Sequence, residues 1–124
     1  MAKRILVIDD EEDILELLDF IFRENGFEVV LSTTGEASEH IREIQPDLVL
    51  LDVRIAGSPK SGPDICKEIK SLVETSHLPV MLLSGEPDLQ IIARECGADA
   101  YLAKPFDIAD LLAQVKALVT ADTL

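Results

Sequence analysis

Hydrophobic and polar positions follow two alternating patterns along the chain. Short apolar runs, typical of strands, are separated by stretches in which apolar residues recur every three or four positions, as on the buried face of a helix. The runs that predict strands are Ile5–Ile8, Glu28–Leu31, Leu48–Leu51, Val80–Leu83 and Ala100–Leu102. The first, third and fourth are apolar without alternation, which indicates parallel strands that are covered on both faces.

A helical pattern follows each predicted strand. The apolar positions that define the helices are Ile14, Leu17, Leu18, Ile21 and Phe22; Ala37, Ile41 and Ile44; Ile65, Ile69, Leu72 and Val73; Ile91, Ile92 and Cys96; and Leu111, Leu112, Val115, Leu118 and Val119. Gly26 and Gly97 are expected to end two of them, Gly62 and Pro63 to open the third, and Asp107 to cap the last. The alternation predicts an α/β fold, a doubly wound five-stranded parallel sheet.

Composition narrows the class of protein. With 124 residues, 48% apolar and 28% charged, the chain fits one globular domain over residues 1–124. It has 11 basic and 24 acidic residues, a net charge of −13, which argues against direct nucleic-acid binding because that binding needs basic residues to neutralise phosphates. No apolar run is long enough for a membrane span, and the isolated Cys66 and Cys96 fit buried thiols in a reducing, cytoplasmic compartment.

Polar residues follow four of the predicted strands, at the sheet edge where ligands of such folds bind. They are Asp9, Asp10, Asp52, Ser84 and Lys104. Each alone has an ordinary explanation as a helix cap, a turn residue or a solvated charge. Together they place one ammonium group among three carboxylates, whose repulsion a hard cation such as Mg²⁺ (or Mn²⁺) would relieve.

These groups fit phosphoryl transfer to an aspartate. Asp52 stands alone at the centre of the predicted sheet and is the expected nucleophile, which would form an acyl phosphate. Asp9 and Asp10 would hold the cation. The Lys104 ammonium and the Ser84 hydroxyl would hold phosphoryl oxygens.

Four motifs in order resemble the receiver domain of two-component response regulators, and the chain is similar to the family's single-domain chemotaxis members. The motifs are ILVIDDEEDI, PDLVLLDV, LLSG and YLAKPF. The resemblance covers essentially the whole chain. It implies a flavodoxin-like (βα)5 fold with strand order 2-1-3-4-5 and a cis bond between Lys104 and Pro105.

The resemblance also implies a role for each matched acid. Asp52 corresponds to the phosphoacceptor. Asp9 and Asp10 correspond to the acids that bind Mg²⁺ together with Asp52, and the main-chain carbonyl of Arg54 is a further metal ligand. The metal site is therefore expected to join two loops that are far apart in the chain.

Three further residues match the family's phosphate-binding and switch positions. Lys104 corresponds to the phosphate-binding lysine, and Ser84 to the hydroxyl that moves to meet the phosphoryl group. Tyr101 corresponds to the switch aromatic that turns inward after phosphorylation. Its ordinary explanation is a tyrosine packed on the last strand with its hydroxyl at the surface.

The function implied by the resemblance is a phosphorylation-controlled signalling switch, not an enzyme beyond its own phosphorylation and dephosphorylation. A sensor histidine kinase or a histidine phosphotransfer domain would donate the phosphoryl group. Phosphorylation would change the face formed by the fourth helix, fifth strand and fifth helix, which a downstream protein or an output domain would read. The same face is the expected surface of a homodimer.

Two alternatives stay open. A receiver-like interaction module that is never phosphorylated usually lacks an acid or the lysine, and this chain retains them all. An aspartate-nucleophile phosphatase usually carries an acid two residues after the nucleophile, to protonate the leaving group, and here that residue is Arg54.

The loop after Asp52 departs from the family pattern. Ile55 and Ala56 stand where Met-Pro is usual, and the loop is slightly longer, with a stretch at residues 57–62 that predicts a flexible turn and not buried structure. Arg54 and Glu86 lie two residues after Asp52 and Ser84. We hypothesise that they form an ion pair that shields the acyl phosphate from water; the alternative is two solvated charges. The terminal TADTL is either a tail or the start of a linker.

Overall fold

The computed structural model describes residues 2–120, so the last four residues of the TADTL segment lie outside the described part of the chain. The elements are β1 (Arg4–Ile8), α1 (Glu12–Glu24), β2 (Glu28–Ser32), the 3₁₀ helix η1 (Gly35–His40), α2 (Ile41–Ile44), β3 (Leu48–Leu51), α3 (Gly62–Ser71), β4 (Val80–Ser84), α4 (Leu89–Cys96), β5 (Ala100–Ala103) and α5 (Ile108–Thr120). All five predicted strands are confirmed, with bounds that differ by no more than one residue.

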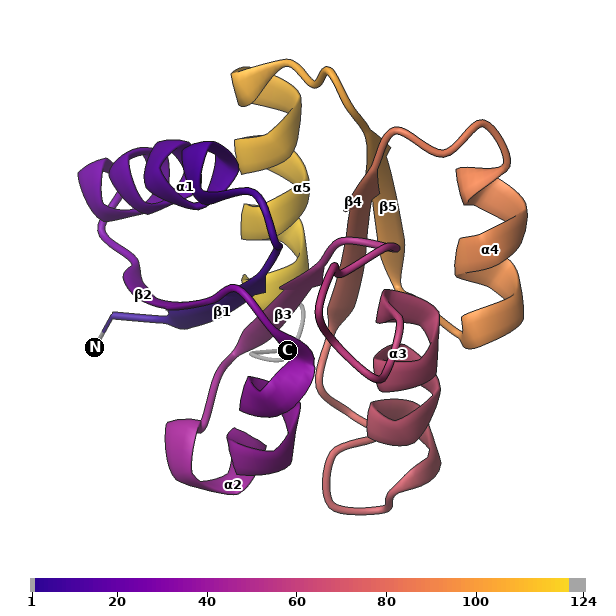
Figure 1. The fold of residues 1–124 in the computed structure, drawn as a ribbon. Coiled ribbons are helices and arrows are strands. Elements are labelled where there is room, and N and C mark those ends of the chain that lie inside the picture. The colour runs from indigo at the N-terminus through magenta and orange to yellow at the C-terminus, as the bar shows by residue number, and fades with distance from the viewer. Residues whose placement is uncertain (1, 121–124) are drawn as a thin grey trace.

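The strands form one sheet in the order β2-β1-β3-β4-β5, and every neighbouring pair is parallel (Figure 1). The predicted fold class and strand order are therefore confirmed. The chain passes from β1 outward to β2 on one side and returns to β3 on the other. The strand order thus reverses between β1 and β3, which places the expected ligand crevice at their carboxyl ends.

Helices cover both faces of the sheet. Helices α1 and α5 pack on one face, and α2, α3 and α4 pack on the other (Figure 1). Alternate residues of β1 enter different cores: Ile5 and Val7 pack with α1 and α5, whereas Leu6 and Ile8 pack with the helices of the opposite face. This explains why the central strands are apolar at every position. No helix within residues 2–120 has the length and apolar character needed to cross a bilayer.

Helix α3 ends earlier than its apolar pattern predicts. The prediction placed Leu72 and Val73 on the buried face, but the helix stops at Ser71, and these two residues are 55% and 92% exposed. Leu72 has an extended backbone, and the Thr75 hydroxyl donates a 2.7 Å hydrogen bond back to the Ile69 carbonyl. A local turn therefore ends the helix and leaves two apolar side chains uncovered.

Two other predicted core positions lie at the surface. Helix α4 buries Leu89, Ala93 and Cys96, and Ile91 is 56% exposed. On α1, Leu15 is buried and Leu17 is 41% exposed. The predicted helices are present. The prediction of which residues face the core was wrong at these positions, because packing against the sheet, and not the local pattern, determines which face is buried.

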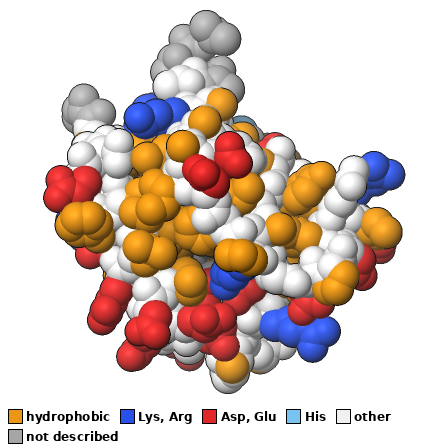
Figure 2. Space-filling model, turned by 90° about the horizontal axis from the view of Figure 1, so that it is seen from above, with side chains coloured by type: hydrophobic (Ala, Val, Ile, Leu, Met, Phe, Trp, Pro, Cys, Tyr) orange, Lys and Arg blue, Asp and Glu red, His pale blue; other side chains and the backbone are white. Residues whose placement is uncertain are grey.

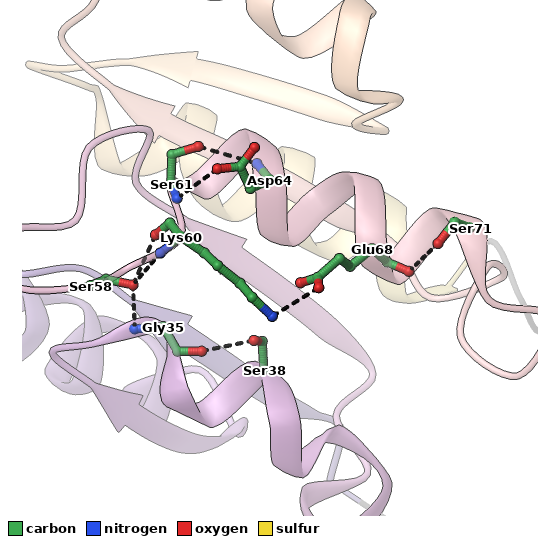
Figure 3. Close-up of polar contacts among 8 residues, drawn as sticks. All are labelled: Gly35, Ser38, Ser58, Lys60, Ser61, Asp64, Glu68 and Ser71. Carbon is green, nitrogen blue, oxygen red and sulfur yellow. Dashed lines mark hydrogen bonds and ion pairs between the residues drawn. The ribbon is translucent and has the colours of Figure 1, made fainter.

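The loop between β3 and α3 is held by hydrogen bonds at several points. Within the predicted turn at residues 57–62, residues 57–61 are exposed or half-buried, as expected, and Gly62 is buried. The Ser58 hydroxyl accepts hydrogen bonds from the amides of Gly35 and Lys60, both at 3.3 Å, and donates to the Lys60 carbonyl at 2.8 Å (Figure 3). Hydrogen bonds thus give this polar, Gly-rich stretch a fixed path.

Gly62 lets the start of α3 lie directly against the backbone of Asp52. Its amide donates a 2.9 Å hydrogen bond to the Val53 carbonyl, and a Cβ at this position would lie 1.9 Å from the Asp52 carbonyl oxygen. Ser61 caps the helix with a reciprocal pair of hydrogen bonds to Asp64, both 3.2 Å (Figure 3). Helix α3 therefore fixes the position of the residues that follow β3.

We expect Gly62→Ala to lower the free energy of unfolding by about 1–3 kcal/mol, because the added Cβ can fit only if the backbone moves. Urea unfolding measures the change. Gly85→Ala is the matched control, since a Cβ there meets nothing within 4 Å, and it should change stability by less than about 0.5 kcal/mol. Equal effects of the two substitutions would contradict the close approach.

Candidate functional site

The carboxyl ends of four strands bring the predicted site residues to one edge of the sheet. Sheet hydrogen bonding continues into the first residue after each of two strands. The Asp9 amide donates to the Ser32 carbonyl at 3.1 Å, and the Asp52 amide donates to the Ile8 carbonyl at 3.0 Å. Both aspartates therefore lie on rigid backbone at the crevice between β1 and β3.

Burial separates these side chains from ordinary surface polar groups. Within residues 2–120, the polar or charged residues in the core are Asp9 (2% exposed), Asp52 (8%) and Ser84 (4%). A buried carboxylate is costly unless a charge or hydrogen-bond donors compensate it. Two neighbouring buried carboxylates therefore require a cation nearby.

Lys104 supplies that positive charge. Its Nζ lies 2.9 Å from Asp9 Oδ2, 3.5 Å from Asp52 Oδ2 and 3.8 Å from Glu11 Oε1. The Lys104 amide donates to the Ser84 carbonyl at 2.9 Å, which continues the pairing of β4 with β5. The ammonium group thus bridges the carboxylates that follow β1 and β3.

The bond between Lys104 and Pro105 is cis, as the resemblance implied. The sequence did not predict that Glu11 would reach the site. Nothing local distinguishes it from the acids beside it. Its contact with Lys104 follows from the way the loop after β1 meets the loop after β5.

Three carboxylates form a group that could hold a metal ion. Asp9, Asp10 and Asp52 each offer one oxygen, and these oxygens lie within 4.8 Å of one another. Hard oxygen donors with excess negative charge fit Mg²⁺ or Mn²⁺. The single ammonium group of Lys104 leaves part of this charge uncompensated, so the residues present fit a divalent cation.

The environment of Asp52 opposes its ionisation. Burial and the charge of Asp9 raise the pKa of this carboxyl group, against the lowering effects of Lys104 and of the Val53 amide, which donates to Asp52 Oδ1 at 2.7 Å. Burial also disfavours the charged form of Lys104. Its hydrogen bond to Asp9 and the charges of Asp52 and Asp9 outweigh burial and raise the pKa of the ammonium group.

The site residues do not serve as helix caps. Glu11 is the residue before α1, and the Asp9 carboxylate instead accepts a 2.9 Å hydrogen bond from the Glu11 amide. Asp88 is the residue before α4, several positions beyond Ser84, whose hydroxyl accepts from the Glu86 amide at 3.3 Å. Both contacts join a side chain to the amide two residues further on, which is a local turn and not a helix cap. The helix-cap explanation therefore does not account for Asp9 or Ser84.

Arg54 and Glu86 meet at the mouth of the site. Arg54 Nε lies 2.5 Å from Glu86 Oε1, so the predicted ion pair is present in the structure. The Arg54 side chain is 83% exposed and the Glu86 side chain 22% exposed. The pair joins the loop after β3 to the loop after β4. Tyr101, on β5, is 40% exposed, so its side chain is at the surface.

An apolar patch lies on the face formed by α1 and α5. Figure 2 shows hydrophobic side chains gathered in the middle of this face, with acidic side chains along its lower edge. Leu17 and Phe20 of α1 and Ile108 of α5 are 41%, 65% and 47% exposed. Apolar surface bordered by charge is typical of a protein-docking surface.

Residues 5–116 match the family model described as the response regulator receiver domain. The chain is similar to a candidate response regulator from Chloroflexus aurantiacus, at 32% identity over 97% of this chain and 99% of that chain, with a TM-score of 0.89. It is similar to NtrX from Brucella abortus, at 31% identity over 99% of this chain and 28% of NtrX, with a TM-score of 0.87. The chemotaxis protein CheY4 from Vibrio cholerae shares the fold, at 22% identity over 95% of this chain and 99% of that chain, with a TM-score of 0.85.

We expect Asp52→Asn to raise the free energy of unfolding of the metal-free protein by about 1 kcal/mol near neutral pH. The raised pKa means that the folded protein binds this proton more tightly than the unfolded chain does, so ionised Asp52 opposes folding. That cost is fully present above the folded-state pKa and disappears as the pH falls to the ordinary value of 3.8. Urea unfolding in EDTA at several pH values measures it.

Asp64→Asn is the control for this prediction. Hydrogen bonds from the Ser61 amide and hydroxyl lower the pKa of exposed Asp64, so its ionised form favours folding and its replacement should destabilise the protein. The two substitutions should therefore act in opposite directions at neutral pH. A change of the same sign in both would contradict the electrostatic explanation.

Proposed function

Because the chain belongs to the response regulator receiver domain family, we propose that it is a signalling switch in which Asp52 accepts a phosphoryl group. The observation that carries this proposal is the position of Lys104, whose Nζ lies 2.9 Å from Asp9 and 3.5 Å from Asp52 at the carboxyl edge of the sheet. Asp52 follows the central strand β3, and the receiver domain itself is proposed to span residues 1–124.

In the proposed reaction, a carboxylate oxygen of Asp52 attacks the phosphorus of the donor. A bond forms between this oxygen and phosphorus, and the bond from phosphorus to the leaving group breaks, with its electron pair remaining on the leaving group. The donor is the phosphohistidine of a sensor histidine kinase or of a histidine phosphotransfer domain. Lys104, already beside Asp52, is placed to pair with a phosphoryl oxygen, and the Ser84 hydroxyl to donate to another.

Asp9, Asp10 and Asp52, with the main-chain carbonyl of Arg54, are the proposed ligands of Mg²⁺ (or Mn²⁺). The three carboxylate oxygens within 4.8 Å of one another support this assignment. A bound cation would neutralise charge on the phosphoryl oxygens. The Gly62 contact holds the backbone of residues 52–53 in place, immediately before the proposed carbonyl ligand.

Ser84 and Tyr101 are the proposed switch residues. Ser84 pairs with Ala103 in the sheet, so a shift of Ser84 toward the phosphoryl group acts on β5, where Tyr101 lies. Tyr101 is 40% exposed in this structure and would turn inward after phosphorylation. The two movements would change the α4-β5-α5 face, which a downstream target or an output domain reads, or through which two copies pair.

The apolar patch on α1 and α5 is the proposed docking surface for the phosphoryl donor. Leu17, Phe20 and Ile108 provide exposed apolar contacts on this face. The net charge of −13 argues against nucleic acid as a direct partner. Cys66 and Cys96 are buried free thiols, which supports a cytoplasmic location.

The alternatives have less support. An unphosphorylated interaction module would have no need for three clustered acids and a lysine between them. A phosphatase would need a proton donor two residues after Asp52, and Arg54 there is an exposed guanidinium group paired with Glu86.

Incubation with acetyl phosphate and Mg²⁺ should add one phosphoryl group to the protein, detected by mass spectrometry of the intact chain. Asp52→Asn should abolish the adduct because an amide nitrogen or oxygen cannot form the acyl phosphate, and EDTA should suppress it. Asp64→Asn, which replaces an exposed carboxylate hydrogen-bonded to Ser61, should leave it unchanged. An adduct that persists in Asp52→Asn, or none on the native protein, would overturn the assignment.

Loss of the Arg54–Glu86 ion pair should shorten the lifetime of the phosphorylated protein by up to about fivefold, because an exposed pair contributes at most about 1 kcal/mol. The measurement is the decay of the phosphorylated form of Arg54→Ala and of Glu86→Ala after the donor is removed. Arg23→Ala, which breaks a 2.6 Å ion pair with Asp19 on α1, is the control. Unchanged lifetimes in both site variants would show that the pair does not shield the acyl phosphate, and would leave the proposed role of Asp52 unaffected.

A further inference from the structure

A groove separates η1 and α2 from α3, on the sheet face opposite to α1 and α5. We call it the α2–α3 groove; its volume is about 230 Å³. Its apolar lining consists of Ile41, Ile65, Ile69 and Leu72. The first three are buried, whereas Leu72 is 55% exposed and is followed by Val73, which is 92% exposed. The apolar stripe of α3 thus runs out of the core and into solvent along this groove.

Apart from Glu39, the polar side chains that line the groove already have partners. The Ser38 hydroxyl donates to the Gly35 carbonyl at 2.7 Å, and the Thr75 hydroxyl donates to the Ile69 carbonyl at 2.7 Å. Lys60 Nζ lies 2.8 Å from Glu68 Oε1, and Arg42 forms an ion pair with Glu74. A ligand would therefore gain little from polar contacts inside the groove and more from burying an apolar group against its lining.

The size of the groove favours a side chain over a whole small molecule. Pockets for small ligands usually have about 300–1,000 Å³, and this groove is smaller and is open to solvent. Exposed Leu72 and Val73 extend the apolar surface beyond its end. One or two apolar side chains carried by a polypeptide would fill the space and cover these residues.

The charged residues at the rim indicate which charge that polypeptide should carry. Glu39 lines the groove and is exposed, and Glu36 lies one 3₁₀ turn before it on η1, so the two side chains share a face of this helix. The charge of Glu39 contributes to the raised pKa of Lys60, but neither glutamate side chain forms a hydrogen bond or ion pair within residues 2–120. The basic residues of the rim, Arg42 and Lys60, are already paired with Glu74 and Glu68. The charges that remain available are therefore acidic, and they complement a basic partner.

The groove is formed before any partner binds. Ser58 joins the loop after β3 to the Gly35 amide, and the Lys60 side chain extends from this loop to Glu68 of α3 (Figure 3). The same loop is held to α3 by Gly62. Both walls are thus connected through one segment with a fixed path, which reduces the ordering that binding would require.

We propose that the α2–α3 groove is a docking site for one or two apolar side chains on a basic segment of a partner protein. The site is separate from the proposed phosphoacceptor and from the α4-β5-α5 face. Docking there does not depend on phosphorylation of Asp52, so its test can fail or succeed independently of the proposed function.

Two synthetic peptides test the proposal: one has two leucines flanked on each side by two lysines, and the other has serines in place of the leucines. In an NMR titration of ¹⁵N-labelled protein, the leucine peptide should shift amide signals of residues 38–42 and 65–75. It should bind about tenfold more tightly than the serine peptide, which has the same charge. Shifts centred on another face, or equal binding of the two peptides, would overturn the proposal.

Two pairs of variants locate the contact. Leu72→Ser should weaken binding of the leucine peptide about fivefold. Ile91→Ser should leave this binding unchanged, although Ile91 is 56% exposed and Leu72 is 55% exposed. Glu39→Gln should weaken the binding of both peptides, whereas Glu95→Gln, at an exposed position on α4, should leave it unchanged. All four positions are exposed, so folding is retained and is verified from the same spectra.

Equal effects within either pair would overturn the assignment. Concentration-dependent self-association that Leu72→Ser abolishes and Ile91→Ser does not would show that a second copy of the chain occupies the groove. That result would replace the basic partner with a homodimer.

Discussion

The Lys104 ammonium group is the interaction on which the site depends. Asp9 and Asp52 are almost fully buried, and two such carboxylates side by side would repel each other and oppose folding. The ammonium group lies within 2.9 Å of one and 3.5 Å of the other, and hydrogen bonds from the amides of Glu11 and Val53 complete their environment. The raised pKa of Asp52 shows that this compensation is incomplete. The remaining negative charge fits the site to a divalent cation, which the proposed phosphoryl transfer would use.

The loop after β3 connects this charge cluster to the rest of the molecule. It begins at Asp52 and passes Arg54, whose side chain pairs with Glu86 at the mouth of the site. It then contacts η1 through Ser58 and ends at Gly62, packed on the Asp52 carbonyl. One segment therefore positions Asp52, the proposed phosphoacceptor, contributes to the opening of the site and connects the walls of the α2–α3 groove. Its polar composition conceals this role because hydrogen bonds between distant residues, and not apolar burial, hold most of it in place.

Where sequence patterns misplaced residues, a tertiary contact or a local turn explains the difference. The stripe that includes Leu72 and Val73 has helical spacing, but the turn that follows, held in part by Thr75, ends α3 at Ser71. On α4, the small Ala93 faces the core, and the larger Ile91 lies at the surface. Periodicity gives the existence of a helix reliably. It cannot give the rotation of a short helix when apolar residues occupy more than one face, because the shape of the sheet decides which face is buried.

The sequence by itself determined the parallel α/β architecture, because three strands without alternation can be buried only between two helical layers. It also placed five polar residues at strand ends, since the carboxyl ends of parallel strands share one edge. Tertiary structure decided how those residues meet. Lys104 and Asp9 are 95 residues apart in the chain, and the contact of Glu11 with Lys104, the approach of Gly62 to Asp52 and the uncovered groove at Leu72 have no local signature. These features depend on distances between elements, which packing sets and periodicity does not.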